Sequence, residues 1–188
     1  MIPLFVGLTL VNLIGLGVTT ALGYSSLRSG GEIKPAHILA GALATLACCG
    51  VHCVAFTYFI ATAKWVQHAV LVKRLDPALA APTRSFKRQA FPAALAAMAI
   101  VFATAVLGAA RDNYGIPRIW HHAFALVALA VNVGVAIVEY RAIARNGLLI
   151  DSILATIARQ PQPPEALTPA PAPGNILPPQ PTPRMPPP

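Results

Sequence analysis

Acidic residues are scarce in this chain of 188 residues, which has 6 Asp and Glu against 14 Lys and Arg. Charged residues make up only 11% of the sequence, whereas hydrophobic residues make up 56% and the mean hydropathy is +0.63. A soluble domain carries about 25% charged residues. The composition therefore excludes an ordinary soluble fold and predicts an integral membrane protein.

Four stretches almost without charge cover residues 2–24, 36–63, 90–110 and 119–140. Each is long enough to cross the hydrocarbon core, which takes about 20 residues of helix. No Lys or Arg precedes the first stretch, and its apolar run exceeds that of a typical secretory signal, so we expect a retained helix. The sequence predicts an all-α fold in which residues 1–145 form an antiparallel four-helix transmembrane bundle.

The basic residues are distributed unevenly between the connecting segments. Four lie between the first and second or the third and fourth stretches: Arg28, Lys34, Arg111 and Arg118. Nine lie between the second and third stretches or within 20 residues after the fourth stretch: Lys64, Lys73, Arg74, Arg84, Lys87, Arg88, Arg141, Arg145 and Arg159. The positive-inside rule then predicts that both termini and the segment between the second and third stretches lie in the cytoplasm. The net charge of +8 is thus explained by topology and attraction to anionic lipid, rather than by nucleic-acid binding.

Two segments follow the fourth stretch. The apolar pattern of residues 146–160 predicts a short amphipathic helix on the cytoplasmic surface. Its apolar face consists of Leu149, Ile150, Ile153, Leu154 and Ile157. Residues 161–188 contain 13 prolines in 28 residues, which predicts a disordered, largely extended tail. This tail is either simply solvated or a docking strip for a proline-reading partner.

The stretch CCGVHC at 48–53 gathers all three cysteines around His52. A c-type haem needs Cys-x-x-Cys-His, and that order is absent. Neighbouring residues on a helix diverge by about 100°, so these four side chains cannot close around one zinc ion. We therefore interpret the cysteines as packing residues, which leaves His52 to be explained.

Small and polar residues form stripes at helical spacing within three of the apolar stretches. The stripes are His37, Gly41, Thr45, Cys48 and His52; His121, Ala125, Ala128, Asn132 and Glu139; and Asn12, Gly15, Thr19 and Gly23. Small residues allow membrane helices to pack closely, whereas polar and ionisable side chains inside a bilayer are candidates for function. Both interpretations of the stripes stay open.

Counting along the helices predicts three polar layers. They are a histidine cluster (His37, His121 and His122), a His/Asn layer (His52, Asn132 and Asn12) and a Tyr/Glu layer (Tyr58 and Glu139). The connections GGEIKPAHI and NYGIPRIWHH each run Gly, Pro, His into the next helix. This match suggests two related hairpins in which His37 and His121 occupy equivalent positions.

Two neutral imidazoles from facing helices can hold a b-type haem in a bundle core. The candidate cofactor-binding residues are His37, His121, His122, His52 and Gly41, with Arg111, Arg118 or Lys34 available to the haem propionates. The arrangement resembles, in architecture only, the four-helix cytochromes b and the haem-bearing anchor subunits of respiratory complexes. His52 has no histidine at its own depth, so we predict one bis-histidine site, formed by His37 with His121 or His122.

The run HCVAFTYFIATAKWV resembles a run in small uncharacterised bacterial inner-membrane proteins. This resemblance implies a bacterial inner-membrane location and no particular activity. No phosphate-binding glycine loop or nucleophile triad occurs, so we do not expect an independent enzyme. The first hypothesis is a membrane subunit or small electron-transfer protein with one haem b. The alternatives are a cofactor-free scaffold that recruits a partner through its tail, and a transporter of metal or protons. In the membrane we expect other subunits or further copies of the chain as partners.

Overall fold

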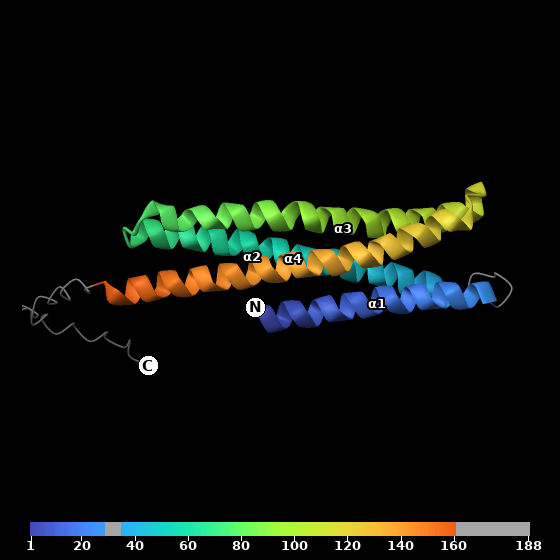
Figure 1. The fold of residues 1–188 in the computed structure, drawn as a ribbon, viewed down its shortest axis with the longest axis horizontal. Helices are drawn as coiled ribbons and strands as arrows, with labels where there is room; N and C mark the ends of the chain where they lie inside the picture. Colours follow the sequence, from blue (N-terminus) through green and yellow to red (C-terminus); the bar gives the residue numbers. More distant parts are fainter. Residues whose placement is uncertain (29–34, 161–188) are drawn as a thin grey trace, which may run out of the picture.

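The computed structural model describes residues 1–28 and 35–160, which are almost entirely helical (Figure 1). The elements are α1 (Ile2–Arg28), α2 (Pro35–Val72), the short 3-10 helix η1 (Pro77–Ala80), α3 (Ala81–Tyr114) and α4 (Arg118–Arg159). The described ranges contain no β-strand, which confirms the predicted all-α class. The proline-rich segment 161–188, the candidate residue Lys34 and most of the first connection lie outside the described residues.

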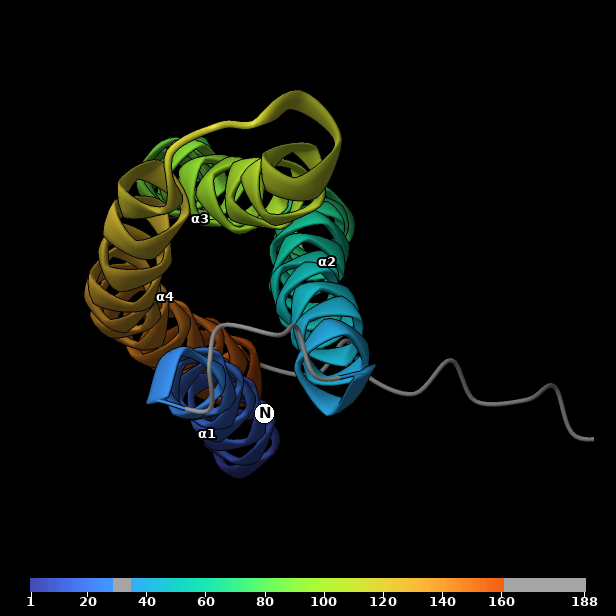
Figure 2. The same ribbon diagram turned by 90° about the vertical axis from the view of Figure 1, so that its right-hand side faces the viewer.

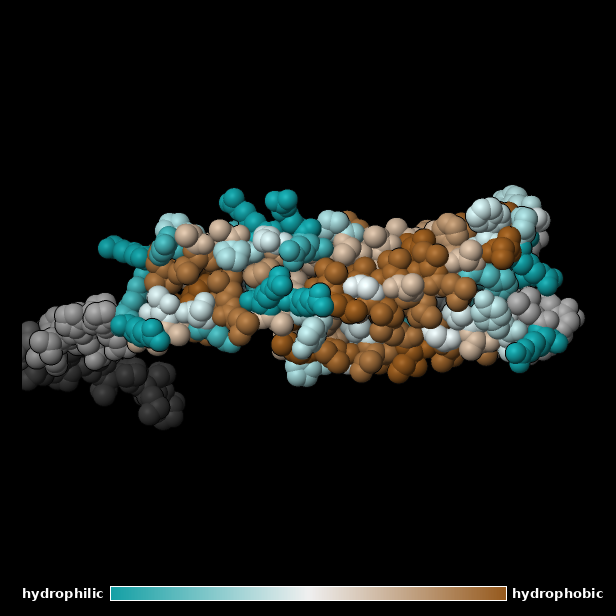
Figure 3. Space-filling model, in the orientation of Figure 1, coloured by the Kyte–Doolittle hydropathy of each residue, from teal (hydrophilic) through white to brown (hydrophobic). Residues whose placement is uncertain are grey.

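All four long helices are long and apolar enough to cross a membrane. Large apolar side chains such as Leu10, Leu46 and Phe102 are exposed on the outside of the bundle. The space-filling view shows apolar surface over much of the part that contains α1, with hydrophilic residues at its end and across the middle of the molecule (Figure 3). An apolar surface of this extent suits lipid rather than water. The chain therefore has the build of a multi-pass membrane protein.

The helices form a ring in the order α1, α2, α3, α4, and each packs against its two neighbours (Figure 2). α2 and α4 lie across the ring from each other. Small buried residues fill part of the centre, among them Ala44, Cys48, Val101 and Ala128. Small side chains let membrane helices approach closely, so Cys48 and Ala128, which belong to the predicted stripes, do serve packing.

The helix ends follow from local chemistry. Pro35 begins α2, where its missing N–H is not needed for a helical hydrogen bond. Before η1, the Asp76 carboxylate accepts a hydrogen bond of 2.8 Å from the backbone N–H of Ala78. Gly115 follows α3 with φ of 65°, and its N–H donates to the Arg111 carbonyl at 3.1 Å. That left-handed conformation, which glycine adopts readily, ends the helix.

α3 differs from its expected extent because it begins at Ala81 rather than near Ala90. Pro92, the third residue of the stretch expected at 90–110, therefore lies inside α3. The polar stretch before Pro92 is helical because Phe86 and Ala90 are buried in a core cluster with Phe59. One lost backbone hydrogen bond at a proline is tolerated in long packed helices of this kind.

Residues 146–159 do not form a separate helix, because α4 continues unbroken to Arg159. No break in α4 marks the expected domain boundary at 145/146. Ile153 is fully buried against Val66, Val70 and Leu75. Leu149, Ile150 and Ile157 pack on the same cluster, whereas Leu154 is exposed. The apolar face predicted to lie on a membrane surface is therefore largely covered by α2 and by the segment around η1.

Candidate functional site: a histidine-lined cavity

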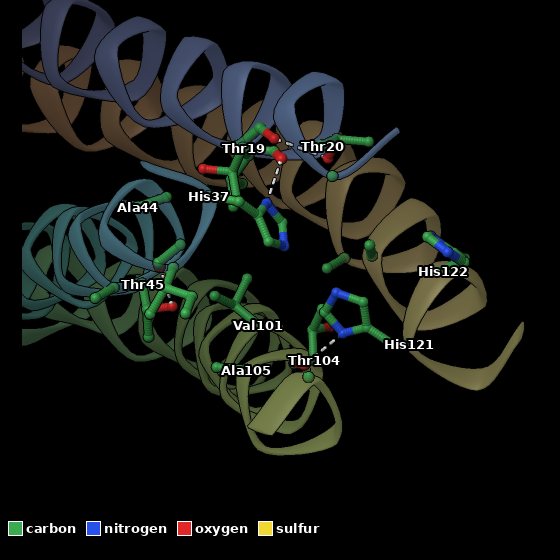
Figure 4. Close-up of a pocket in the computed structure, with 18 of the residues that line it drawn as sticks. Thr19, Thr20, His37, Ala44, Thr45, Val101, Thr104, Ala105, His121 and His122 are labelled. Atoms are coloured by element: carbon green, nitrogen blue, oxygen red, sulfur yellow. Dashed lines mark hydrogen bonds between the residues drawn. The ribbon is translucent and has the colours of Figure 1, made fainter. Parts of the chain in front are cut away.

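A cavity of about 360 Å³ lies between all four helices, at the end of the bundle where α1 ends and α2 begins. We call this the cavity end. Figure 4 shows the cavity with its lining side chains. The residues used below are Thr19 and Gly23 of α1, His37 and Gly41 of α2, Thr104 and Gly108 of α3, and His121 of α4.

His37 is held by the backbone of α1. Its Nδ1 lies 3.0 Å from the carbonyl oxygen of Thr19. A carbonyl only accepts, so Nδ1 carries the hydrogen and the neutral ring keeps an unprotonated Nε2. The ring lies against Gly23, where an added Cβ would come within 3.0 Å of His37 Cε1. Glycine at this position therefore makes room for the imidazole to reach the helix backbone.

His121 repeats this arrangement on the other pair of helices. Its Nδ1 donates to the carbonyl oxygen of Thr104 at 3.0 Å. An added Cβ at Gly108 would come within 2.9 Å of His121 Cε1. The spacing Thr-x-x-x-Gly followed by His on the next helix thus occurs twice. The two hairpins place their histidines in matching environments, in keeping with the equivalence that the sequence suggested for His37 and His121.

The two imidazoles face each other across the cavity. Their ring centroids are 6.2 Å apart, and the ring planes are 84° from parallel. In Figure 4 the nitrogen that makes no hydrogen bond points into the cavity from each ring. The cavity thus presents two neutral nitrogen donors from opposite sides.

Two imidazole nitrogens are a donor set that a protein can offer to an iron porphyrin. A metal ion bound at about 2.0 Å by one nitrogen from each of two opposed imidazoles sets their centroids about 6.3 Å apart. The observed separation of 6.2 Å is close to this value. Each bound nitrogen would have its partner N–H anchored on a carbonyl, which is the usual way a ligating histidine is oriented.

The remaining predicted site residues take different positions. Gly41 lines the cavity, and a Cβ there would make ordinary contact with Thr19 at 3.6 Å. His122 lines it too, but its ring stacks on Tyr24 with centroids 5.3 Å apart. Of the cations predicted for propionates, Arg111 lines the cavity, whereas Arg118 is not among the lining residues.

His52 lies outside the cavity and belongs to a separate buried pair. Its Nδ1 lies 3.0 Å and 3.1 Å from the two carboxylate oxygens of Glu139. Both side chains are buried, with 2% and 1% of their surface exposed. The sequence placed His52 level with Asn132 and Glu139 level with Tyr58, so this pairing differs from the predicted layers.

The three buried polar residues of α4, which are Asn132, Glu139 and Asn146, recur every seventh position, and each has a partner on another helix. Asn132 Oδ1 accepts from Asn12 Nδ2 and from Cys48 Sγ, both at 3.3 Å. Asn146 Nδ2 donates to Thr62 Oγ1 at 3.0 Å. Glu139 stands between them in sequence with His52 as its partner. A period of seven keeps these side chains on one face of a packed helix, which explains why all three point inward.

The three cysteines differ in burial, and Cys48 packs in a core cluster. Cys48 is buried, Cys49 is half-buried and Cys53 is exposed, and all three are free thiols. Among residues 1–28 and 35–160, no group of three or more His, Cys, Asp or Glu side chains is placed to bind a metal ion. The cavity offers two imidazoles, which suits a cofactor that brings its own equatorial ligands rather than a bare ion.

Comparison with protein-family models, with curated proteins and with solved structures gives no match to this chain. The functional argument therefore depends on the geometry of the cavity and of the buried pair.

Proposed function

We propose that this protein is a small electron-transfer protein, or a subunit of a larger membrane complex, that holds one b-type haem between α2 and α4. Nε2 of His37 and Nε2 of His121 would hold the haem iron. When bound, the haem supplies a one-electron ferric/ferrous couple. The observation that carries the proposal is the pair of opposed imidazoles, 6.2 Å apart, each anchored through Nδ1 on a backbone carbonyl.

The chain's own residues supply binding and orientation. The carbonyls of Thr19 and Thr104 fix the tautomer and direction of the two rings. Gly23 lets the His37 ring lie against α1, and Gly108 lets the His121 ring lie against α3. Gly41 also lines the cavity, and its lack of a side chain leaves space there. Arg111 at the cavity supplies a cation for a propionate carboxylate.

We also propose a topology for this bundle. The helices run antiparallel, with both termini and the end opposite the cavity in the cytoplasm of a bacterium, and with the cavity near the outer face of the inner membrane. The support is the nine basic residues that lie between the second and third apolar stretches or shortly after the fourth. Reporter fusions after residue 75 and residue 115 test this orientation: activity of a cytoplasmic reporter is expected only at the first site.

The test of the haem proposal is a reduced-minus-oxidised visible spectrum of protein purified in detergent from haem-supplied cells. We expect cytochrome b bands and about one extracted haem per chain. His37→Ala and His121→Ala should each lose most of the bound haem. His122→Ala is the matched control, because its ring stacks on Tyr24 and lies next to His121 without the carbonyl anchor.

A colourless wild-type protein, or haem content unchanged in both His37→Ala and His121→Ala, contradicts the proposal. A colourless protein would favour the cofactor-free scaffold, and deletion of residues 161–188 would then test partner binding through the tail.

A further inference from the structure

We propose that His52 and Glu139 form a proton-binding pair inside the bundle, whose affinity for a proton rises when an electron enters the haem site. This inference rests on the proposed function, and it assigns a role to the strongest buried polar contact outside the cavity.

The pair is isolated from water. His52 and Glu139 are 98% or more buried, since 2% and 1% of their surface is exposed. The bond from Nδ1 to the carboxylate uses one ring nitrogen, and Nε2 has no hydrogen-bond partner within the described part of the chain. An ionisable pair at this depth of a membrane helix is costly and is a candidate for function by default.

Proton number decides the charge of this pair. With one proton, on Nδ1, the imidazole is neutral and the carboxylate leaves a net charge of −1. A second proton, on Nε2 or on the carboxylate, makes the pair neutral overall. A net charge in a low-dielectric interior is strongly disfavoured, so the protonation of the pair responds to any other charge that changes inside the bundle.

Few other groups near the pair could take up this proton. On the neighbouring turns, Asn12 of α1 and Asn132 of α4 are polar but do not titrate. Among the described residues, the titratable side chains that lie near the pair on α2 include Cys48, and Tyr58 on the adjoining core cluster. The buried positions of α3 opposite this layer are apolar, from Ala90 to Val101. Among these groups, Glu139 is the carboxylate whose charge can change.

An electron entering the cavity site adds one negative charge to the bundle. His37 and His52 are separated by 15 residues of continuous helix, or about 22 Å at 1.5 Å per residue. Buried apolar residues such as Leu16, Ala44 and Ala128 lie in the core between them. In this apolar surrounding the added negative charge favours protonation of the pair. The electron comes from an external reductant, and the proton that is taken up comes from water.

The test is a redox titration of the purified holoprotein at a series of pH values, with dithionite as reductant. We expect the wild-type midpoint potential to fall as pH rises, because reduction carries a proton. Glu139→Gln keeps a polar side chain of the same size but cannot change charge, and should lose most of this pH dependence. Asp151→Asn is the matched control, because it removes an exposed acid from the same helix.

A second measurement uses wild-type protein alone, so it does not depend on whether a variant folds. The reduced-minus-oxidised infrared difference spectrum of wild-type protein should contain bands of a protonated carboxyl or of an imidazolium. These bands should move when the protein carries isotope-labelled glutamate or histidine.

The outcomes are distinct. A coloured protein whose potential does not change with pH overturns this inference and leaves the haem proposal standing. The same slope in wild type and Glu139→Gln does so too, because it assigns the proton to groups at the cavity such as His122. A protein that binds no haem overturns both proposals.

Discussion

Each cavity histidine depends on one backbone carbonyl and one glycine. The carbonyls of Thr19 and Thr104 take the Nδ1 hydrogens, which leaves the opposite nitrogen of each ring with a lone pair. The glycines at 23 and 108 decide whether the rings can reach those carbonyls. A methyl group at either position therefore acts on the imidazole rather than on the helix itself.

Gly108→Ala tests this at a single residue. The new Cβ would lie 2.9 Å from His121 Cε1, so the ring must move away from Thr104. We expect haem content to fall several-fold, although alanine is intrinsically better in a helix than glycine by about 1 kcal/mol. Extracted haem per chain is the measurement.

The matched control is Gly134→Ala on α4, where an added Cβ meets nothing within 4 Å. This variant should keep its haem and unfold at a slightly higher denaturant concentration. Equal haem content in both variants would show that the imidazole position does not depend on Gly108.

At this scale the sequence identified His37, His121 and Gly41 but not what holds them. The carbonyls of Thr19 and Thr104 are backbone atoms, and every residue has one, so composition gives no signal for them. The repeated Thr-x-x-x-Gly spacing at 19–23 and 104–108 was a readable signal. It gains meaning only when the histidine of the following helix is aligned with it.

At the scale of the element, the buried polar residues of α4 are spaced seven positions apart. Asn132, Glu139 and Asn146 all lie on the buried face and all bond to a residue across a helix interface. Polar contacts of this kind fix the register of packed helices, because a shift leaves buried groups without partners. The period thus sets how α2 and α4 are aligned across the ring.

Asn132→Ala tests this register function. It removes an acceptor shared by Asn12 and Cys48, and it leaves two donors without that partner inside the bundle. We expect a loss of about 1–2 kcal/mol in the free energy of unfolding, measured by detergent denaturation.

Asn113→Ala serves as the comparison. Asn113 is exposed at the end of α3, and its side chain donates only to the Ala109 carbonyl of its own helix. A change within a few tenths of a kcal/mol is expected for an exposed site of this kind. If the two variants lose the same stability, Asn132 does not couple the helices.

The sequence could place four apolar helices but not the pairing between them. Counting residues assumed that Asn132 and His52 share a depth. In the structure Asn132 meets Cys48, one turn earlier on α2, and His52 meets Glu139. Side chains lean along the helix toward its N-terminus and helices cross at an angle. Counting residues along the helices therefore predicts the order of the polar layers. Which polar side chains form hydrogen bonds with each other depends on how the helices pack.

At the scale of the whole molecule, α1 is much shorter than α4, with 27 residues against 42. α2, α3 and α4 continue past the N-terminus of α1 and form an extension without it (Figure 1). The extension has its own core of Val66, Ala69, Val70, Leu75 and Ile153. The sequence assigned residues 146–160 to a separate surface helix. In the structure the C-terminal part of α4 belongs to this extension and packs against α2 and the segment around η1.

The variant Ile153→Ala tests whether residues 146–159 pack in the extension or lie on the membrane surface. Ile153 is fully buried, so its truncation should leave a cavity and destabilise the extension by about 2–5 kcal/mol. Hydrogen exchange should then speed up in residues 146–159 and in the facing end of α2, while the cavity end keeps its protection. Leu154→Ala is the control, because Leu154 is about half exposed at 48%. A helix lying on lipid would bury both side chains in the bilayer alike, and equal exchange in the two variants would support that arrangement over the packed extension.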